Sequence, residues 1–130
     1  MNSIDARAYT RIALEIGLEV ERIPDGKKQK GRTQNISTNG LFIHCESPFS
    51  AGTECILKLF VEGSACDVLV HAKIEVVYSN AFGMGAQLIC HLNLCSYDHL
   101  KKLVLYNADT ETGKAIENEI NADLNRIWEG

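Results

Sequence analysis

The strongest structural signal in this chain is an alternation of apolar and polar positions. From Ile12 to Val20 every second residue is a branched aliphatic, and alanine, glutamate and glycine fill the positions between them. Side chains of a β-strand point alternately to opposite faces, so a period of two predicts a strand with one buried face. Because the same alternation returns in several later segments, the chain is restricted to folds built mainly from strands.

Turn residues divide the chain into six expected strands. Pro24-Asp25-Gly26 predicts a reversal after the first strand, and Asn39-Gly40 predicts another, with Gly40 at positive φ. The second strand, near residues 28–37, is polar and is expected on a solvated face or at an edge. The remaining expected strands cover residues 41–46, 55–61, 66–78 and 82–90.

Two details of the later strands bear on side-chain placement. The run from Cys66 to Tyr78 keeps the period of two, which places Tyr78 on the same face as Ile74. In the last segment, Gly83 and Gly85 indicate a sharp bend or a close approach of another backbone.

The spacing of apolar residues becomes helical from about Ser96. Leu100, Leu103 and Val104 lie at i, i+3 and i+4, which predicts a helix that closes the barrel. Residues 107–113 are polar and predict a linker. Beyond the linker, an apolar stripe among acidic residues predicts a second, amphipathic helix. The stripe consists of Ile116, Ile120, Leu124 and Ile127, with Trp128 beside it.

Strands joined by local turns and followed by helix predict an all-β fold. We expect a six-stranded antiparallel β-barrel with a C-terminal α-helix and an additional amphipathic helical tail. Three parts are expected: a flexible N-terminal arm (residues 1–11), the barrel with its closing helix (12–106), and the linker with the amphipathic helix (107–130).

Composition constrains the compartment. The five cysteines are widely spaced and form no CxxC pair, which favours a reducing compartment. A zinc site at His44-Cys45 and Cys90-His91 is conceivable, but we expect buried cysteines that pack as small hydrophobic residues. Since no apolar run could span a bilayer and the first residues lack an apolar signal stretch, we expect a cytoplasmic protein without membrane insertion.

The sequence contains no motif for catalysis. It has no GxSxG, no HExxH, no phosphate-binding glycine loop and no paired carboxylates, so we expect neither an enzyme nor a resident metal or cofactor. The formal net charge is -4, yet seven of the thirteen basic residues precede Asn35 and six acidic residues follow Asn107. An anionic ligand, if the chain binds one, is therefore expected near the N-terminus. The overall charge and the scarcity of aromatic residues near the arginines disfavour single-stranded nucleic acid.

Two short motifs remain that could bind a ligand. Arg7 and Arg11 form an RxxxR pair just before the first strand, and residues 35–40 form the string NxSxxG at the expected hairpin between the second and third strands. Taken alone, the arginines are typical of a solvated surface pair, and the second string is typical of turn chemistry.

The two motifs in this order resemble the PilZ domain, a bacterial receptor module for cyclic di-GMP. The resemblance extends to Gly40-Leu41-Phe42-Ile43, Ser47-Pro48-Phe49 and Phe82-Gly83-Met84-Gly85, and covers residues 5–105. It implies a six-stranded antiparallel barrel with a C-terminal helix. Many relatives carry another basic residue just before RxxxR, where this chain has Ala6, so the number of bound ligand molecules stays open.

The resemblance also implies a ligand-binding site. Arg7 and Arg11 would bind the phosphodiesters or guanines of cyclic di-GMP, because a guanidinium can donate two parallel hydrogen bonds to acceptors and can also stack on aromatic rings. Asn35 and Ser37 would point from the barrel surface at a guanine edge, and Gly40 would turn the backbone without a Cβ in the way. Thr38 and Asn39 would be secondary contacts.

The expected output is a changed contact with another protein. The N-terminal arm would be loose without ligand and would wrap over bound cyclic di-GMP, presenting a new surface to an unidentified effector in motility or exopolysaccharide secretion. The alternative is a PilZ-like structural adaptor that binds proteins without nucleotide. The stripe of the second helix can pack on its own barrel or on a second subunit. Of the two, we expect a homodimer through Ile116, Ile120, Leu124 and Ile127, because an exposed apolar seam tends to find a partner.

Overall fold

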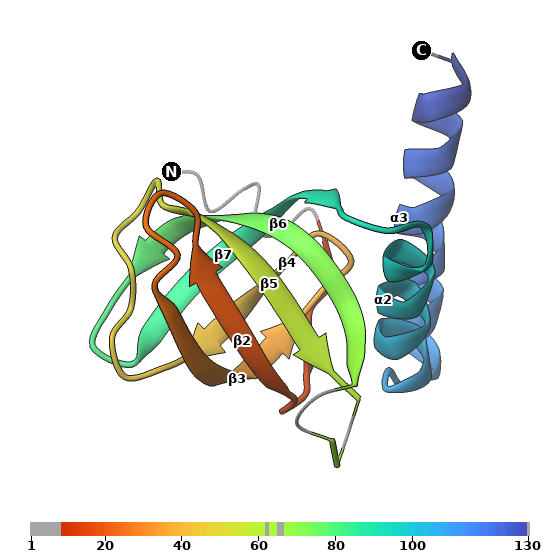
Figure 1. Ribbon diagram of the computed structural model, residues 1–130. Helices are drawn as coiled ribbons and strands as arrows, with labels where there is room; N and C mark the ends of the chain where they lie inside the picture. The colour runs from red at the N-terminus through yellow and green to blue at the C-terminus, as the bar shows by residue number, and fades with distance from the viewer. Residues whose placement is uncertain (1–8, 62, 65–66, 130) are drawn as a thin grey trace.

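The computed structural model describes residues 9–61, 63–64 and 67–129. These residues form a β-barrel followed by two helices (Figure 1). The elements, in chain order, are β1 (Ile12–Ala13), β2 (Gly17–Arg22), β3 (Lys28–Ile36), β4 (Gly40–His44), β5 (Glu54–Phe60), β6 (Val68–Ser79), β7 (Gly83–His91), α2 (Leu94–Tyr106) and α3 (Thr110–Glu129).

The sheet closes on itself. Its strand order is β1-β3-β2-β5-β6-β7-β4, and β4 pairs in addition with β3, so β2 to β7 form a closed ring. Every pairing is antiparallel, and the two-residue β1 only extends the edge of β3. The predicted six-stranded antiparallel barrel with two C-terminal helices is therefore confirmed.

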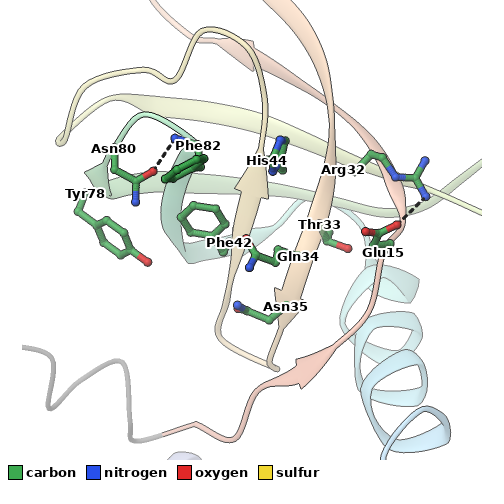
Figure 2. A pocket seen from close by; sticks show the side chains of 10 residues that line it. All are labelled: Glu15, Arg32, Thr33, Gln34, Asn35, Phe42, His44, Tyr78, Asn80 and Phe82. Atoms are coloured by element: carbon green, nitrogen blue, oxygen red, sulfur yellow. Dashed lines mark hydrogen bonds and ion pairs between the residues drawn. The ribbon is translucent and has the colours of Figure 1, made fainter.

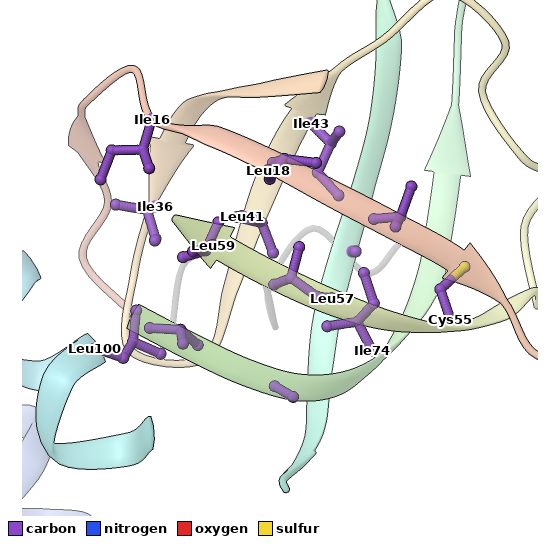
Figure 3. Close-up of a cluster of buried hydrophobic side chains, with 14 of the residues drawn as sticks. Ile16, Leu18, Ile36, Leu41, Ile43, Cys55, Leu57, Leu59, Ile74 and Leu100 are labelled. Carbon is purple, nitrogen blue, oxygen red and sulfur yellow. The ribbon is translucent and has the colours of Figure 1, made fainter. Parts of the chain in front are cut away.

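The core lies inside this ring. The predicted apolar faces of β2, β5 and β6 point inward, where Leu18, Leu57 and Ile74 are at most 1% exposed (Figure 3). Leu100 of α2 covers one end of the cluster. Burial of such side chains stabilises the fold by about 1.5–3 kcal/mol each. The alternating apolar residues that predict the strands are thus also the residues that form most of the core.

The first predicted strand is interrupted. Ala13 pairs with Asn35 and Gly17 pairs with Arg32, so the three residues between Ala13 and Gly17 stand opposite only two residues of β3. The buried side chain of Thr33 fills the gap, because its Oγ1 donates to the carbonyl of Leu14 and accepts from the amide of Ile16 (2.9 Å). The prediction of one continuous strand over residues 12–20 is wrong at this point, since β1 ends at Ala13 and β2 begins at Gly17.

Replacing Thr33 by valine should destabilise the barrel by about 1–3 kcal/mol, because the buried amide of Ile16 would lose its acceptor while the side-chain shape is kept. Urea unfolding measures this loss. Thr33→Ser keeps the hydroxyl and is the matched control, for which a smaller loss is expected. If the valine variant were as stable as the wild type, Thr33 would not be the group that holds the interrupted strand.

The helices differ from prediction in two respects. α3 begins at Thr110, so residues 110–113 are helical and the linker is shorter than predicted. Ile116 is 0% exposed and Ile120 is 6% exposed, and both belong to the buried core cluster. Figure 1 shows why: the first turns of α3 lie beside α2. The predicted dimer seam is therefore wrong for Ile116 and Ile120, because they are buried within their own chain.

The other two seam residues are not described. The side chains of Leu124 and Ile127 lie outside the described part of the chain, and a homodimer through them stays a prediction. Light scattering on the full chain tests it.

The cysteines divide into two groups. Cys45 and Cys55 are buried as expected, and burial raises the pKa of the Cys55 thiol to about 11. Cys90 and Cys95 are exposed, which contradicts the expectation that the cysteines are buried, and Cys66 lies outside the described residues. Within the described part of the chain, no group of three or more His, Cys, Asp or Glu side chains could hold a metal ion, and no helix is long and apolar enough to cross a membrane.

Candidate ligand-binding site

A pocket of about 750 Å³ lies on the outer face of the barrel, where β3, β4 and the β6–β7 turn meet (Figure 2). Figure 2 shows two different ends: the charged side chains of Arg32 and Glu15 gather at one and aromatic side chains at the other, and Asn35 lies at the lower edge, below Gln34. The lining residues are Glu15, Arg32, Thr33, Gln34, Asn35, Phe42, His44, Tyr78, Asn80 and Phe82.

Two β-bulges turn key side chains into this pocket. Thr33 pairs with Ile43 and Asn35 with Phe42, so Gln34 is an extra residue in β3 and Asn35 faces outward beside it. In β6, Val76 pairs with Ala86 and Tyr78 with Gly85, so Val77 is an extra residue there as well. A bulge reverses the alternation beyond it, which explains why Tyr78 is exposed although the period of two predicted it on the inner face.

The aromatic end is held by backbone contacts. The ring of Tyr78 lies against Gly85, where a Cβ would come within 2.2 Å of the Tyr78 ring. Its centroid is 6.1 Å from that of Phe42, within the range of paired aromatic rings. Phe82 is 68% exposed at the turn, where Asn80 Oδ1 accepts hydrogen bonds from the amides of Phe82 and Gly83. This end therefore presents aromatic surface to solvent.

The two sequence motifs meet at the pocket. Arg11 Nη1 donates to Asn35 Oδ1 over 2.7 Å, although the residues are 24 positions apart. The pairing of β1 with β3 sets Ala13 opposite Asn35 and so brings Arg11 to this side of the barrel. Arg7, the other predicted arginine, lies outside the described residues.

The charged end contains an ion pair that the motifs did not predict. Arg32 lies on β3, and its Nη2 is 3.7 Å from Glu15 Oε1. The side chains are 60% and 74% exposed, so water screens this pair and it contributes little to stability. The Arg32 guanidinium can therefore leave Glu15 for another anion at small cost.

Ser37 does not point out of the barrel as expected. It is 2% exposed, and its Oγ donates to the Gly40 carbonyl and accepts from the amides of Asn39 and Gly40. Thr38 is buried and Asn39 is partly exposed in the same hairpin. The hydroxyl of Ser37 thus serves the turn, in keeping with the turn chemistry of the motif.

Glycine is required at position 40 for a different reason from the predicted one. Positive φ occurs at Gly26, Gly52 and Gly63 among the described glycines, not at Gly40. A Cβ on Gly40 would lie 2.6 Å from the carbonyl oxygen of Ala86, so glycine is needed because β7 approaches closely. Gly83 is constrained in the same way by the carbonyl of Ile43, which confirms the close approach predicted for that segment.

Comparison with known families decides what kind of domain this is. Residues 5–106 match the PilZ domain family. The chain belongs to the PilZ domain family. This family binds cyclic di-GMP. The match contains both motifs, and α3 lies beyond its end.

Solved structures agree on the fold of this PilZ domain. It resembles the PilZ domain of CeSA from a cellulose-synthesizing bacterium (TM-score 0.54, 20% identity, covering 75% of this chain and 96% of that one). It also resembles the PilZ domain of YcgR from Escherichia coli, solved with c-di-GMP (TM-score 0.56, 11% identity, 90% and 95% coverage). MrkH, a c-di-GMP-dependent transcription regulatory factor, is similar over 49% of its own length (TM-score 0.55, 16% identity, 75% coverage of this chain). No curated protein sequence matches the chain.

Proposed function

We propose that this PilZ domain is a non-enzymatic receptor that binds cyclic di-GMP in the pocket beside Arg11. The observation that carries the proposal is the hydrogen bond between Arg11 and Asn35 at the edge of an aromatic pocket. It joins the RxxxR and NxSxxG motifs in one place, and the family to which the chain belongs binds this ligand.

The chemistry of the pocket suits the ligand. Cyclic di-GMP carries two phosphodiester anions and two guanines, so its receptor needs cations, stacking surfaces and neutral hydrogen-bonding groups. Arg11 can donate paired hydrogen bonds to a phosphate or to guanine O6 and N7. Tyr78 and Phe82 offer ring faces for stacking, and Asn35 offers a side-chain amide for hydrogen bonding. Each charged hydrogen bond contributes about 1.5–3 kcal/mol, so a few of them account for a large part of micromolar affinity.

The remaining motif residues take supporting roles in this proposal. Arg7 would bind the ligand from the N-terminal arm (residues 1–11), as the family resemblance implies. Ser37 and Gly40 would support the ligand by fixing the hairpin that carries Asn35, with Thr38 and Asn39 as secondary contacts.

Arg32 adds a cation to the site in this proposal. Replacing it with alanine should weaken cyclic di-GMP binding by about tenfold, the loss of one charged hydrogen bond. Lys30→Ala is the matched control, because Lys30 is an exposed cation on the same strand that does not line the pocket. Calorimetric titration of both variants checks this, and equal affinities for the two would exclude Arg32 from the site.

Ligand binding would change what the domain presents to an effector protein. The arm carries both arginines, so engaging the ligand alters the surface around residues 1–11. Processes such as motility or exopolysaccharide secretion would be the setting, as in the family.

Calorimetric titration of the full chain tests the proposal. Cyclic di-GMP should bind with a dissociation constant at or below about tens of micromolar, corresponding to a free energy of about -6 to -8 kcal/mol. Cyclic di-AMP carries the same charges and should bind at least about tenfold more weakly, because it lacks the guanine O6 acceptor. Absence of heat with cyclic di-GMP would refute the receptor and favour a protein-binding adaptor.

A further inference from the structure

The acidic helix α3 contacts Tyr9 and Thr10, the two residues that precede Arg11. The backbone amide of Thr10 donates to both carboxylate oxygens of Glu119, over 3.0 and 3.1 Å, and the Thr10 hydroxyl donates to the same carboxylate. One helical turn further, Asp123 Oδ1 accepts a hydrogen bond from the Tyr9 hydroxyl over 3.3 Å. Tyr9 and Thr10 are therefore held against α3, whereas a loose arm was expected up to residue 11.

The helix can act as a fixed support because it is anchored in the core. Ile116 and Ile120 are buried on one side of α3, and Glu119 directly precedes Ile120. Tyr97 lies on α2, which packs against α3. Burial is the main cause that raises the pKa of Tyr97, and its interactions with Asp123 and Tyr9 raise it further. The arm, α2 and α3 thus meet at one point, and the Glu119 carboxylate has a fixed position there.

Thr10 is the neighbour of Arg11. Consecutive Cα atoms are about 3.8 Å apart, so fixing the Thr10 amide leaves Arg11 little freedom to move away from the barrel. In the same structure Arg11 already bonds to Asn35 at the pocket. Holding a binding group in place before the ligand arrives removes an entropic cost of binding.

We propose that Glu119 is a positioning residue for ligand binding: by holding Thr10 it keeps Arg11 at the pocket. This inference rests on the proposed function, and it assigns a role to α3, which lies outside the residues matched to the PilZ family. Glu119 itself does not line the pocket.

If only the charge of Glu119 mattered, its removal would have the opposite effect on cyclic di-GMP affinity from the one that positioning predicts. Cyclic di-GMP is a dianion, so removing a nearby carboxylate should tighten its binding if charge alone mattered. If Glu119 instead positions Arg11, removing its carboxylate should weaken the binding of cyclic di-GMP. Glu117 is the matched control, because it is an exposed glutamate on the same helix and its replacement removes the same charge.

Calorimetric titration with cyclic di-GMP distinguishes the two accounts. We expect Glu119→Ala to weaken binding by about tenfold, as expected for a lost preorganised contact. Glu119→Gln should retain most of the affinity, since its amide oxygen still accepts from Thr10, and Glu117→Ala should bind as the wild type or slightly tighter. In an Arg11→Ala background, Glu119→Ala should cause no further loss. Equal or tighter binding by Glu119→Ala, or a loss of the same size in both backgrounds, would overturn the inference.

A measurement without ligand separates this inference from the proposed function. The side-chain amide signals of Asn35 in the NMR spectrum report its bond to Arg11. In Glu119→Ala they should move toward their positions in Arg11→Ala, and in Glu117→Ala they should stay. If wild type does not bind cyclic di-GMP but the Asn35 signals move as stated, the proposed function fails while the positioning by Glu119 holds. Unmoved signals in Glu119→Ala overturn the positioning role, whatever the ligand does.

Discussion

Replacing Arg11 with alanine should reduce the affinity for cyclic di-GMP by about tenfold to a hundredfold. The Arg11 guanidinium uses one nitrogen to bond to Asn35, which lines the pocket, and this leaves its other donors for the ligand. A charged hydrogen bond contributes about 1.5–3 kcal/mol, and about 1.4 kcal/mol corresponds to tenfold in affinity. Calorimetric titration of wild type and variant measures the difference.

Two further variants show what Arg11 contributes. Arg11→Lys keeps the positive charge but loses the bidentate hydrogen bonding and the planar group that can stack, so an intermediate affinity is expected. Lys28→Ala removes one exposed positive charge from the start of β3, away from the pocket lining, and should bind as the wild type. Wild-type affinity in Arg11→Ala would mean that the ligand does not use the RxxxR motif.

Replacing Ile116 with alanine should destabilise the protein by about 2–5 kcal/mol, the usual cost of truncating a fully buried isoleucine. This is a large fraction of the total stability of a small domain, which is about 5–15 kcal/mol. The loss follows from the docking of α3 on its own chain. Urea unfolding at several protein concentrations measures it.

The controls for Ile116 use the same helix. Ile116→Val should lose only about 0.5–1.5 kcal/mol, and Asn121→Ala, at an exposed position, should stay within about 0.5 kcal/mol of wild type. If the loss in Ile116→Ala were below about 1 kcal/mol, or if wild-type stability rose with protein concentration, α3 would be held by a second subunit instead of its own chain.

The sequence predicts the core of this domain better than its surface. Inward positions such as Leu18, Leu57 and Ile74 follow from the period of two, because a buried face tolerates only one register. The bulges do not follow from it, since an extra residue in one strand is visible only when its partner strand is known. Tyr78 is therefore predicted on the wrong face, and the interruption beside Thr33 is missed.

The candidate site is predictable only in part for the same reason. Arg11 and Asn35 are recognised because their motifs resemble a family, and the structure brings them together. Arg32 lies outside the motifs, and Phe82 belongs to a segment that resembles the family without implying a binding role. The place of both residues in the pocket depends on the pairing of β3 with β4 and of β4 with β7. The sequence places most basic residues before Asn35 and six acidic residues after Asn107, but the contact between Thr10 and Glu119 depends on the docking of α3 and does not follow from this pattern.

NMR chemical-shift mapping with cyclic di-GMP tests the location of the site most directly. If the pocket on the outer face of the barrel binds the ligand, the largest changes in backbone amide signals should occur at Arg11, at residues 32–35 and at residues 78–82. The strands β2 and β5, which do not line the pocket, should change little. Changes centred on β2 and β5, with residues 32–35 and 78–82 unaffected, would contradict the site.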